Sequence, residues 1–242
     1  MSLKWRVTCG TLTLAASLLI AGCGTTGNAN VRSVNASPGL TDYNVQVGVT
    51  GIAASLPYGT VGVQPAGQYA TDDSSGNYRQ IGAGLSQKIS IYQKPGTDLT
   101  TSTQTIVKNG YYTILNLGTY PNISLMPLTD DNTSPGAGKF KLRVVNASST
   151  AGPVDIYLTP PGGSISGTPV VSAFQSRQVT SSYLQLAPGT YEVQVTQTGS
   201  TTAIAAAPFS PTGGEVHSVF VLDPAPGSSN FGVLVTNDPL AK

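Results

Sequence analysis

The feature that most constrains this 242-residue chain is a six-residue motif that occurs twice. Segment 32–37 (Arg-Ser-Val-Asn-Ala-Ser) recurs as segment 143–148 (Arg-Val-Val-Asn-Ala-Ser), and 143 − 32 = 111 residues separate them. Segments 43–47 and 154–158 lie at the same offset. We therefore predict one module written twice, with roughly a hundred residues in each copy, enough to bury a core without a metal or a disulfide.

Composition and alternation favour an all-β fold. Ser, Thr, Val and Tyr recur throughout, charged residues make up only 10%, and Gly (28) and Pro (17) are frequent. β-Branched and aromatic side chains suit a pleated sheet, and Gly and Pro separate short strands. Segment 43–49 places Tyr43, Val45, Val47 and Val49 on one face, as in a half-buried strand. The sequence predicts two tandem antiparallel β-sandwich domains, immunoglobulin-like or transthyretin-like, without a firm strand order.

The strand pattern also places the domain boundaries. We expect a first sandwich over 31–130, a linker rich in Gly, Asn and Asp over 131–138, and a second sandwich over 139–242. Strands of the first copy are expected at 31–37, 43–49, 60–65, 78–81, 87–93, 103–107, 111–117 and 123–128, with a turn at 95–98. Those of the second are expected at 140–146, 154–158, 169–174, 182–186, 190–196, 203–208, 216–222 and 231–235.

The first 22 residues are predicted to be a signal peptide. Lys4 and Arg6 precede an uncharged, largely apolar stretch over 7–21, too short for a comfortable membrane span. Segment 19–23 (Leu-Ile-Ala-Gly-Cys) then resembles the lipobox of bacterial lipoproteins. The resemblance implies cleavage before Cys23, diacylglycerol on its thiol and an acyl chain on its new amino group. The alternative is an ordinary signal peptide that happens to contain Cys23. Residues 23–30 are expected to form a flexible tether.

The cysteine count agrees with lipidation. Cys9 lies in the discarded signal, so Cys23 is the one thiol left and no internal disulfide can form. Several acyl chains on one residue anchor a protein stably to the membrane. The lipoprotein resemblance, with Gly24 rather than Asp after the cysteine, implies the outer membrane, facing either the periplasm or the surface. Without Lys4 and Arg6 the chain has 12 − 2 = 10 basic against 11 acidic residues, so we expect no nucleic-acid partner.

Three motifs together resemble a known bacterial repeat. They are Arg-x-Val-Asn-Ala-Ser, Val-Asp-Ile-Tyr at 154–157, and Leu-x-x-Gly-x-Tyr-x-Val at 186–193. This combination resembles domain of unknown function 4397, which implies β-sandwich modules at the cell envelope and no established activity. The second copy fits best. The first departs, with Asn44 where the family usually has Asp and with no Tyr after Gly84.

Catalytic and cofactor sites are not predicted. His217 is the only histidine, and it lies in a strand pattern beside Val219 and Val221. No Gly-x-Ser-x-Gly turn presents a serine nucleophile, and clustered Cys or His ligands for zinc are absent from the sequence. A hydrolase stays as the less favoured alternative. It would need His217 beside a Ser and an Asp in a cleft.

Two acidic stretches invite comparison with calcium sites. Asp72 and Asp73, and separately the stretch from Asp130 to Asn132, could supply oxygen ligands. Neither has the twelve-residue spacing and the closing Glu of a calcium-binding loop. We therefore expect solvated polar loops and no metal site.

The repeated Arg and Asn residues are interpreted as structural. Arg143 is expected to pair with Asp155 on a neighbouring strand, and Arg32 to face Asn44 in the weaker first copy. Alternation along the opening strand is expected to set Arg143, Val145 and Ala147 on one face and Leu142, Val144 and Asn146 on the other. Asn146 ends its strand, where its side chain can bond the backbone of a turn. A motif present in both copies more readily reflects a shared fold than one ligand site.

These observations lead to two main hypotheses of function. The first is a non-catalytic envelope lipoprotein of structural or binding type, with a protein or polysaccharide partner at the loops. The second is a carbohydrate-binding surface module or adhesin, suggested by the many Tyr, Asn, Thr and Ser residues. Its candidate contact strip comprises Tyr92, Tyr111, Tyr112 and Tyr120, although the same residues suit a sheet core.

Overall fold

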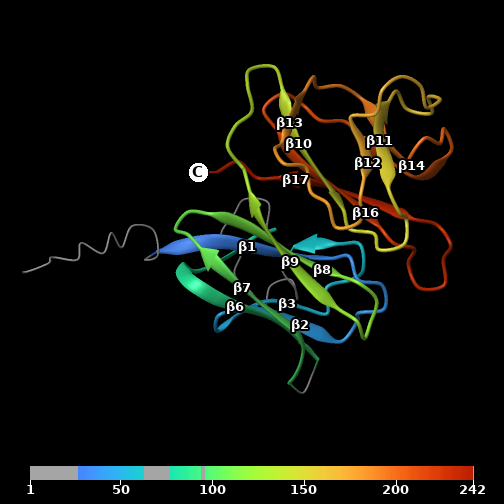
Figure 1. The fold of residues 1–242 in the computed structure, drawn as a ribbon. Coiled ribbons are helices and arrows are strands. Elements are labelled where there is room, and N and C mark those ends of the chain that lie inside the picture. Colours follow the sequence, from blue (N-terminus) through green and yellow to red (C-terminus); the bar gives the residue numbers. More distant parts are fainter. Residues whose placement is uncertain (1–26, 63–76, 94–95, 242) are drawn as a thin grey trace, which may run out of the picture.

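The computed structural model describes residues 27–62, 77–93 and 96–241, and these form two stacked β-sandwiches (Figure 1). The all-β sandwich class predicted from the sequence is confirmed. No helix in the described ranges is long and apolar enough to cross a membrane. Cys23 lies outside the described residues, as do Asp72 and Asp73.

The first sandwich consists of two sheets. One has the order β4-β1-β8-β9, with β5 also paired to β1, and the other has the order β3-β2-β6-β7. The strands of the first sheet are β1 (Asn28–Asn35), β4 (Val61–Gly62), β5 (Arg79–Gly82), β8 (Tyr111–Leu117) and β9 (Ser124–Asp130). Those of the second are β2 (Tyr43–Val47), β3 (Thr50–Ala54), β6 (Gly84–Gln93) and β7 (Thr97–Ile106).

The second sandwich has the same connectivity. One sheet has the order β13-β10-β16-β17 and the other β12-β11-β14-β15. The strands of the first are β10 (Phe140–Asn146), β13 (Leu184–Leu186), β16 (Val216–Leu222) and β17 (Gly232–Asp238). Those of the second are β11 (Val154–Thr159), β12 (Val171–Phe174), β14 (Tyr191–Gln197) and β15 (Ala203–Phe209).

One pairing in each sandwich is parallel, which the strand pattern did not predict. β1 runs parallel to β8 and β10 runs parallel to β16, whereas the other strand pairings in the described ranges are antiparallel. Parallel neighbours need a long crossover connection. Here the crossover is the part of the chain that forms the strands of the opposite sheet, before the chain returns as β8 or β16. The pairing sets Arg32 opposite Thr113 and Arg143 opposite Ser218.

The opening strands β1 and β10 are buried on both faces. In β10, Leu142 and Val144 pack into the core between the two sheets of the second sandwich. Val145 and Ala147 point the other way, as the alternation predicted, into a third apolar cluster shared by both sandwiches. This interface cluster comprises Val34, Ala36, Leu115, Leu117, Leu128, Val145, Ala147, Phe220 and Leu222. The sheet that contains β1, β8 and β9 therefore faces the sheet that contains β10, β16 and β17 (Figure 1).

Four features of the first copy were predicted wrongly. β1 begins at Asn28, inside the predicted tether, because residues 28–31 already pair with β5. Val49, expected on the inner face of a strand, is exposed in the turn that follows the end of β2 at Val47. β3 was not predicted, because Gly48 and Gly51 interrupt the alternation. Gly48 has a φ of +58°, which allows the tight turn between β2 and β3. β7 begins at Thr97, inside the predicted turn, because Thr97 and Asp98 already pair with Gln93 and Tyr92.

Candidate functional site

Two ion pairs connect the sandwiches reciprocally. Arg32 of β1 places Nη1 2.8 Å from Oδ1 of Asp238, which ends β17. Arg143 of β10 places Nη1 2.6 Å from Oδ1 of Asp130, which ends β9. All four side chains are at most 2% exposed. Each sandwich thus supplies the arginine of one pair and the aspartate of the other.

The partners predicted from the sequence were wrong. Arg143 does not pair with Asp155, and Arg32 does not face Asn44, because β10 and β11, like β1 and β2, belong to different sheets. The Asp155 carboxylate instead accepts hydrogen bonds from backbone amides, at 2.7 Å from Ala173 and 3.0 Å from Gly199. Asp155 therefore binds β12 and the turn after β14, both in the sheet β12-β11-β14-β15, which we call the outer sheet.

Two hydroxyl groups close the ion pairs into a ring. Thr113 Oγ1 accepts from Arg32 Nε at 2.9 Å and donates to Asp130 Oδ2 at 2.7 Å. Ser218 Oγ accepts from Arg143 Nε at 3.1 Å and from Arg143 Nη2 at 3.0 Å. It donates to Asp238 Oδ2 at 2.7 Å. The resulting buried ring comprises Arg32, Asp238, Ser218, Arg143, Asp130 and Thr113.

A tyrosine covers each arginine, and the two tyrosines differ. The Tyr78 ring lies 4.6 Å from Arg32 Cζ, and its hydroxyl donates to Asp130 Oδ2 at 2.8 Å. The Tyr183 ring lies 5.4 Å from Arg143 Cζ. Its hydroxyl group lies near the Asp131 backbone but makes no hydrogen bond of ordinary geometry. Tyr78 is fully buried, whereas Tyr183 is half-buried.

Electrostatics favour the charged forms of three ring residues, Asp238, Arg32 and Arg143. Burial alone would raise the pKa of Asp238, but the Arg32 guanidinium and hydrogen bonds outweigh burial and hold that pKa below its ordinary value of 3.8. Burial would likewise lower the pKa of Arg32 and Arg143. The charges of Asp238 and Asp130 instead raise the pKa of each arginine. A buried charge is tolerated when an opposite charge lies beside it. Arg32 has this partner at Nη1 and donates through Nε, whereas its Nη2 makes no hydrogen bond within the described ranges.

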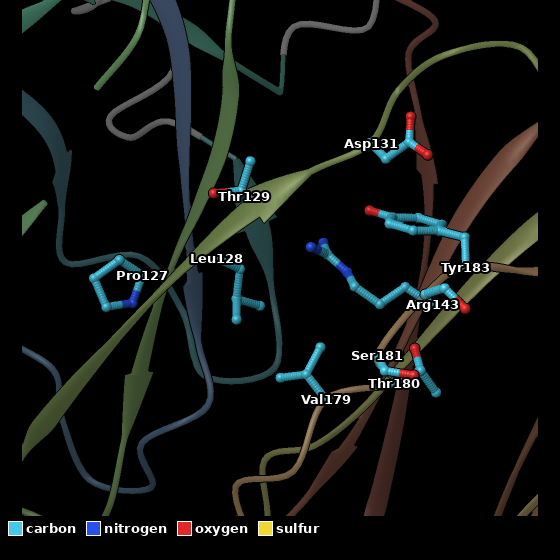
Figure 2. A pocket seen from close by; sticks show the side chains of 10 residues that line it. Pro127, Leu128, Thr129, Asp131, Arg143, Val179, Thr180, Ser181 and Tyr183 are labelled. Carbon is cyan, nitrogen blue, oxygen red and sulfur yellow. The ribbon is translucent and has the colours of Figure 1, made fainter. Parts of the chain in front are cut away.

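A pocket with a volume of about 450 Å³ opens beside the Arg143 half of the ring. Figure 2 shows Arg143 and Tyr183 extending between the sandwiches toward Leu128 and Thr129 of β9. Hydroxyl groups and one carboxylate complete the polar part of the lining. The full lining is Pro127, Leu128, Thr129, Asp131, Arg143, Val179, Thr180, Ser181, Ser182 and Tyr183. The pocket thus combines a guanidinium group, an aromatic ring and hydroxyl groups from both sandwiches.

His217 is buried in the second sandwich. Its Nδ1 lies 2.9 Å from the carbonyl oxygen of Thr236, and its Nε2 lies 3.0 Å from Glu215 Oε2. The rings of Phe140 and Phe209 pack edge-on against it, with centroids 6.1 and 5.0 Å away. Both ring nitrogens therefore contact groups other than a serine hydroxyl.

The acidic stretch considered for calcium is used otherwise. Asp130 belongs to the buried ring, and Asp131 Oδ2 lies 2.6 Å from Lys141 Nζ. No group of three or more His, Cys, Asp or Glu residues within the described ranges could hold a metal ion.

The candidate tyrosine strip does not form. Tyr111 and Tyr112 are buried in the first sandwich, Tyr92 is half-buried and Tyr120 is 43% exposed. Tyr120 lines a small pocket of about 60 Å³ together with Gln93 and Leu99. Tyr183, which lines the pocket beside Arg143, belongs to the strand predicted over 182–186.

The motif asparagines do what the sequence predicted. Asn146 Nδ2 donates to the carbonyl oxygens of Phe174 at 2.9 Å and Gly152 at 3.3 Å. Asn35 makes equivalent bonds to Leu56 at 2.7 Å and Leu40 at 3.3 Å. Each side chain fastens the end of the opening strand to the loops that follow it.

The family model described as "Domain of unknown function (DUF4397)" matches residues 29–157, more than half of the chain. The chain belongs to this family. The DUF4397 match covers the whole first sandwich and continues through β10 into β11, so it includes Arg32, Asp130 and Arg143. No curated protein matches the sequence.

The aspartates of the ring were missed because they lie far from the arginines in sequence. By sequence alone, segment 128–131 (Leu-Thr-Asp-Asp) resembles segment 235–238 (Val-Thr-Asn-Asp), which would equate Asp131 with Asp238. The register corrects this by one residue, since Leu128 lies opposite Thr113 and Thr236 lies opposite Ser218. Asp130 is therefore the counterpart of Asp238, and both aspartates end the last strand of their sandwich.

Proposed function

We propose that this chain is a non-catalytic, lipid-anchored protein of the bacterial cell envelope, whose two sandwiches act as one rigid binding or structural unit. The buried ring is the observation that carries the proposal. Its charged groups bind one another across the junction, so they serve to fix the two sandwiches together. Tyr58 of the first sandwich also donates to the Asp223 carbonyl oxygen of the second.

The anchor of this unit is Cys23. The lipobox ends at this residue, and the described chain begins four residues later, at Gly27. Acylation would hold the first sandwich at a membrane surface, which we assign to the outer membrane, on its periplasmic or surface side. Partners among envelope proteins or polysaccharides then meet the loops and the junction.

A Cys23→Ala substitution in the full chain tests the anchor. The expected result is loss of incorporated fatty-acid label and movement of the protein from the membrane to the soluble fraction. Cys9→Ala is the matched control, because that thiol lies in the discarded signal, and it should keep both label and location. Retention of the Cys23→Ala protein in the membrane would contradict the proposal.

The pocket favours a second candidate function, carbohydrate binding. An aromatic ring flanked by hydroxyl groups suits the alternating apolar and hydroxylated faces of a sugar, and Arg143 suits an acidic one. We expect Tyr183→Ala to abolish binding on a glycan array, with Tyr191→Ala, on the outer sheet, as a control. Silence of the wild-type protein on the array and no retention on peptidoglycan would eliminate this function. The hydrolase alternative draws no support from the buried position of His217.

A further inference from the structure

Three exposed apolar side chains gather at one end of the first sandwich. Val49, between β2 and β3, is 96% exposed, Leu85 in β6 is 70% exposed, and Val107, directly after β7, is 44% exposed. We call these three residues the apolar tip. Single exposed apolar residues are common on protein surfaces, but a group at one place marks an interaction surface.

Strand register brings the apolar tip together. Gly84 pairs with Ile106, so Leu85 and Val107 each lie one residue from this pair, on its two sides. The Gln87 side chain lies against both the turn between β2 and β3 and the start of β6. A Cβ added to Gly48 in that turn would lie 2.5 Å from its amide oxygen, and one added to Gly84 would lie 2.4 Å from its amide nitrogen. Val49 therefore lies on the same end of the sandwich as Leu85.

The described chain begins at this same end. The Ala83 amide donates to the Gly27 carbonyl oxygen at 2.7 Å, and the Asn109 amide donates to the Asn28 carbonyl oxygen at 2.8 Å. The Lys108 side chain packs against Gly27. In Figure 1, β1 starts at this end, where β6 also starts. Gly27 follows Cys23 by four residues, which span at most about 14 Å even when fully extended.

Charge at this end also suits a lipid surface. The segments that meet there, 27–28, 47–50, 82–88 and 104–110, contain Lys88 and Lys108 and neither Asp nor Glu. Lys88 pairs with Asp98 of β7 at 2.9 Å, and Lys108 lies beside Gly27. Lysine next to exposed apolar side chains is the combination found where proteins contact phospholipid headgroups.

We infer that the apolar tip inserts into the headgroup layer of the bilayer that carries the Cys23 lipid. The inference rests on the proposed lipid anchor. It adds a second contact, which holds the first sandwich end-on against the membrane instead of leaving it to swing on its tether.

Tryptophan fluorescence of the acylated full-length protein tests this contact. Trp5 is the only tryptophan and lies in the signal, so a Trp introduced in the processed chain reports alone. Leu85→Trp is compared with Tyr120→Trp, which is 43% exposed at the opposite end, where the Tyr120 hydroxyl donates to Gln93. Both proteins are reconstituted in phosphatidylethanolamine and phosphatidylglycerol vesicles, with and without brominated acyl chains.

We expect Leu85→Trp emission to shift to the blue on reconstitution and to lose intensity with brominated lipid, whereas Tyr120→Trp changes in neither respect. Equal quenching of both variants, or of neither, overturns the inference. Mass spectrometry of the same samples separates the two proposals. A protein without acyl chains refutes the anchor itself, whereas an acylated protein with an unquenched Leu85→Trp refutes only the tip contact. Melting temperatures matching that of the wild type verify that both variants are folded.

Discussion

The two arginine–aspartate pairs are built from equivalent strands, yet their surroundings differ. Arg32 is fully buried, and Tyr78 covers it and bonds to Asp130. Arg143 borders a pocket of about 450 Å³, and Tyr183 covers it without an equivalent bond (Figure 2). We call the first pair sealed and the second open because only the second borders a pocket, although all four side chains are at most 2% exposed. The contrast teaches that a duplicated module can bury both copies of a constellation while one copy forms part of a pocket wall.

Truncating the arginines should change the free energy of unfolding most, and it tests the difference between the two pairs most directly. Arg32→Ala leaves Asp238 buried and unpaired, and we expect a loss of about 3–5 kcal/mol in the free energy of unfolding. Arg143→Ala should cost less, about 1–3 kcal/mol, because water from the pocket can enter the space that the Arg143 side chain leaves beside Asp130. Urea denaturation of both variants measures the difference. Equal losses of stability in the two variants would show that the pocket beside Arg143 makes no energetic difference between the two pairs.

Removing the tyrosine hydroxyl groups should change the free energy of unfolding less, and it compares the two pairs at the level of one hydrogen bond. Tyr78→Phe removes a donor to the buried Asp130 carboxylate and should cost about 1–3 kcal/mol. Tyr183→Phe removes no short hydrogen bond and should change the free energy of unfolding by less than about 0.5 kcal/mol. A Tyr183→Phe loss as large as that of Tyr78→Phe would refute the assigned difference.

Acid should weaken the sealed pair gradually. Since the folded-state pKa of Asp238 is below 3.8, its stabilising contribution is present above the unfolded value and is lost as pH falls through the folded one. Asp131, Glu215 and Asp223 also have lowered pKa values, so the wild type must be compared with Asp238→Asn. The stability difference between the two proteins should stay constant above about pH 5 and shrink progressively as the pH falls below that value. A difference that stays constant below about pH 5 as well would contradict this assignment.

Local patterns predicted most of the strands and the direction in which the opening strands point their side chains. Alternation put Leu142 and Val144 on one face and Arg143 and Val145 on the other, and the two cores use these faces accordingly. The same reasoning missed β3, where glycines interrupt the alternation.

The ring could not be predicted from local patterns, because its members meet only after the two sandwiches dock. Arg32 and Asp238 lie at opposite ends of the chain, and nothing in the neighbourhood of either residue marks the other. Assigning Arg143 to Asp155 followed from the assumption that consecutive strands pair, which is wrong for β10 and β11. The pocket was missed for the same reason, since its lining comes from both sandwiches.

The central claim is that the ring and the interface cluster join the two sandwiches into one unit. Scanning calorimetry of the processed wild-type chain tests it most directly, because the calorimetric and van't Hoff enthalpies agree only when the whole chain unfolds together. We predict a single transition with equal enthalpies for the wild type. Two separable transitions, or a van't Hoff enthalpy well below the calorimetric one, would show that the sandwiches unfold independently and would contradict the claim.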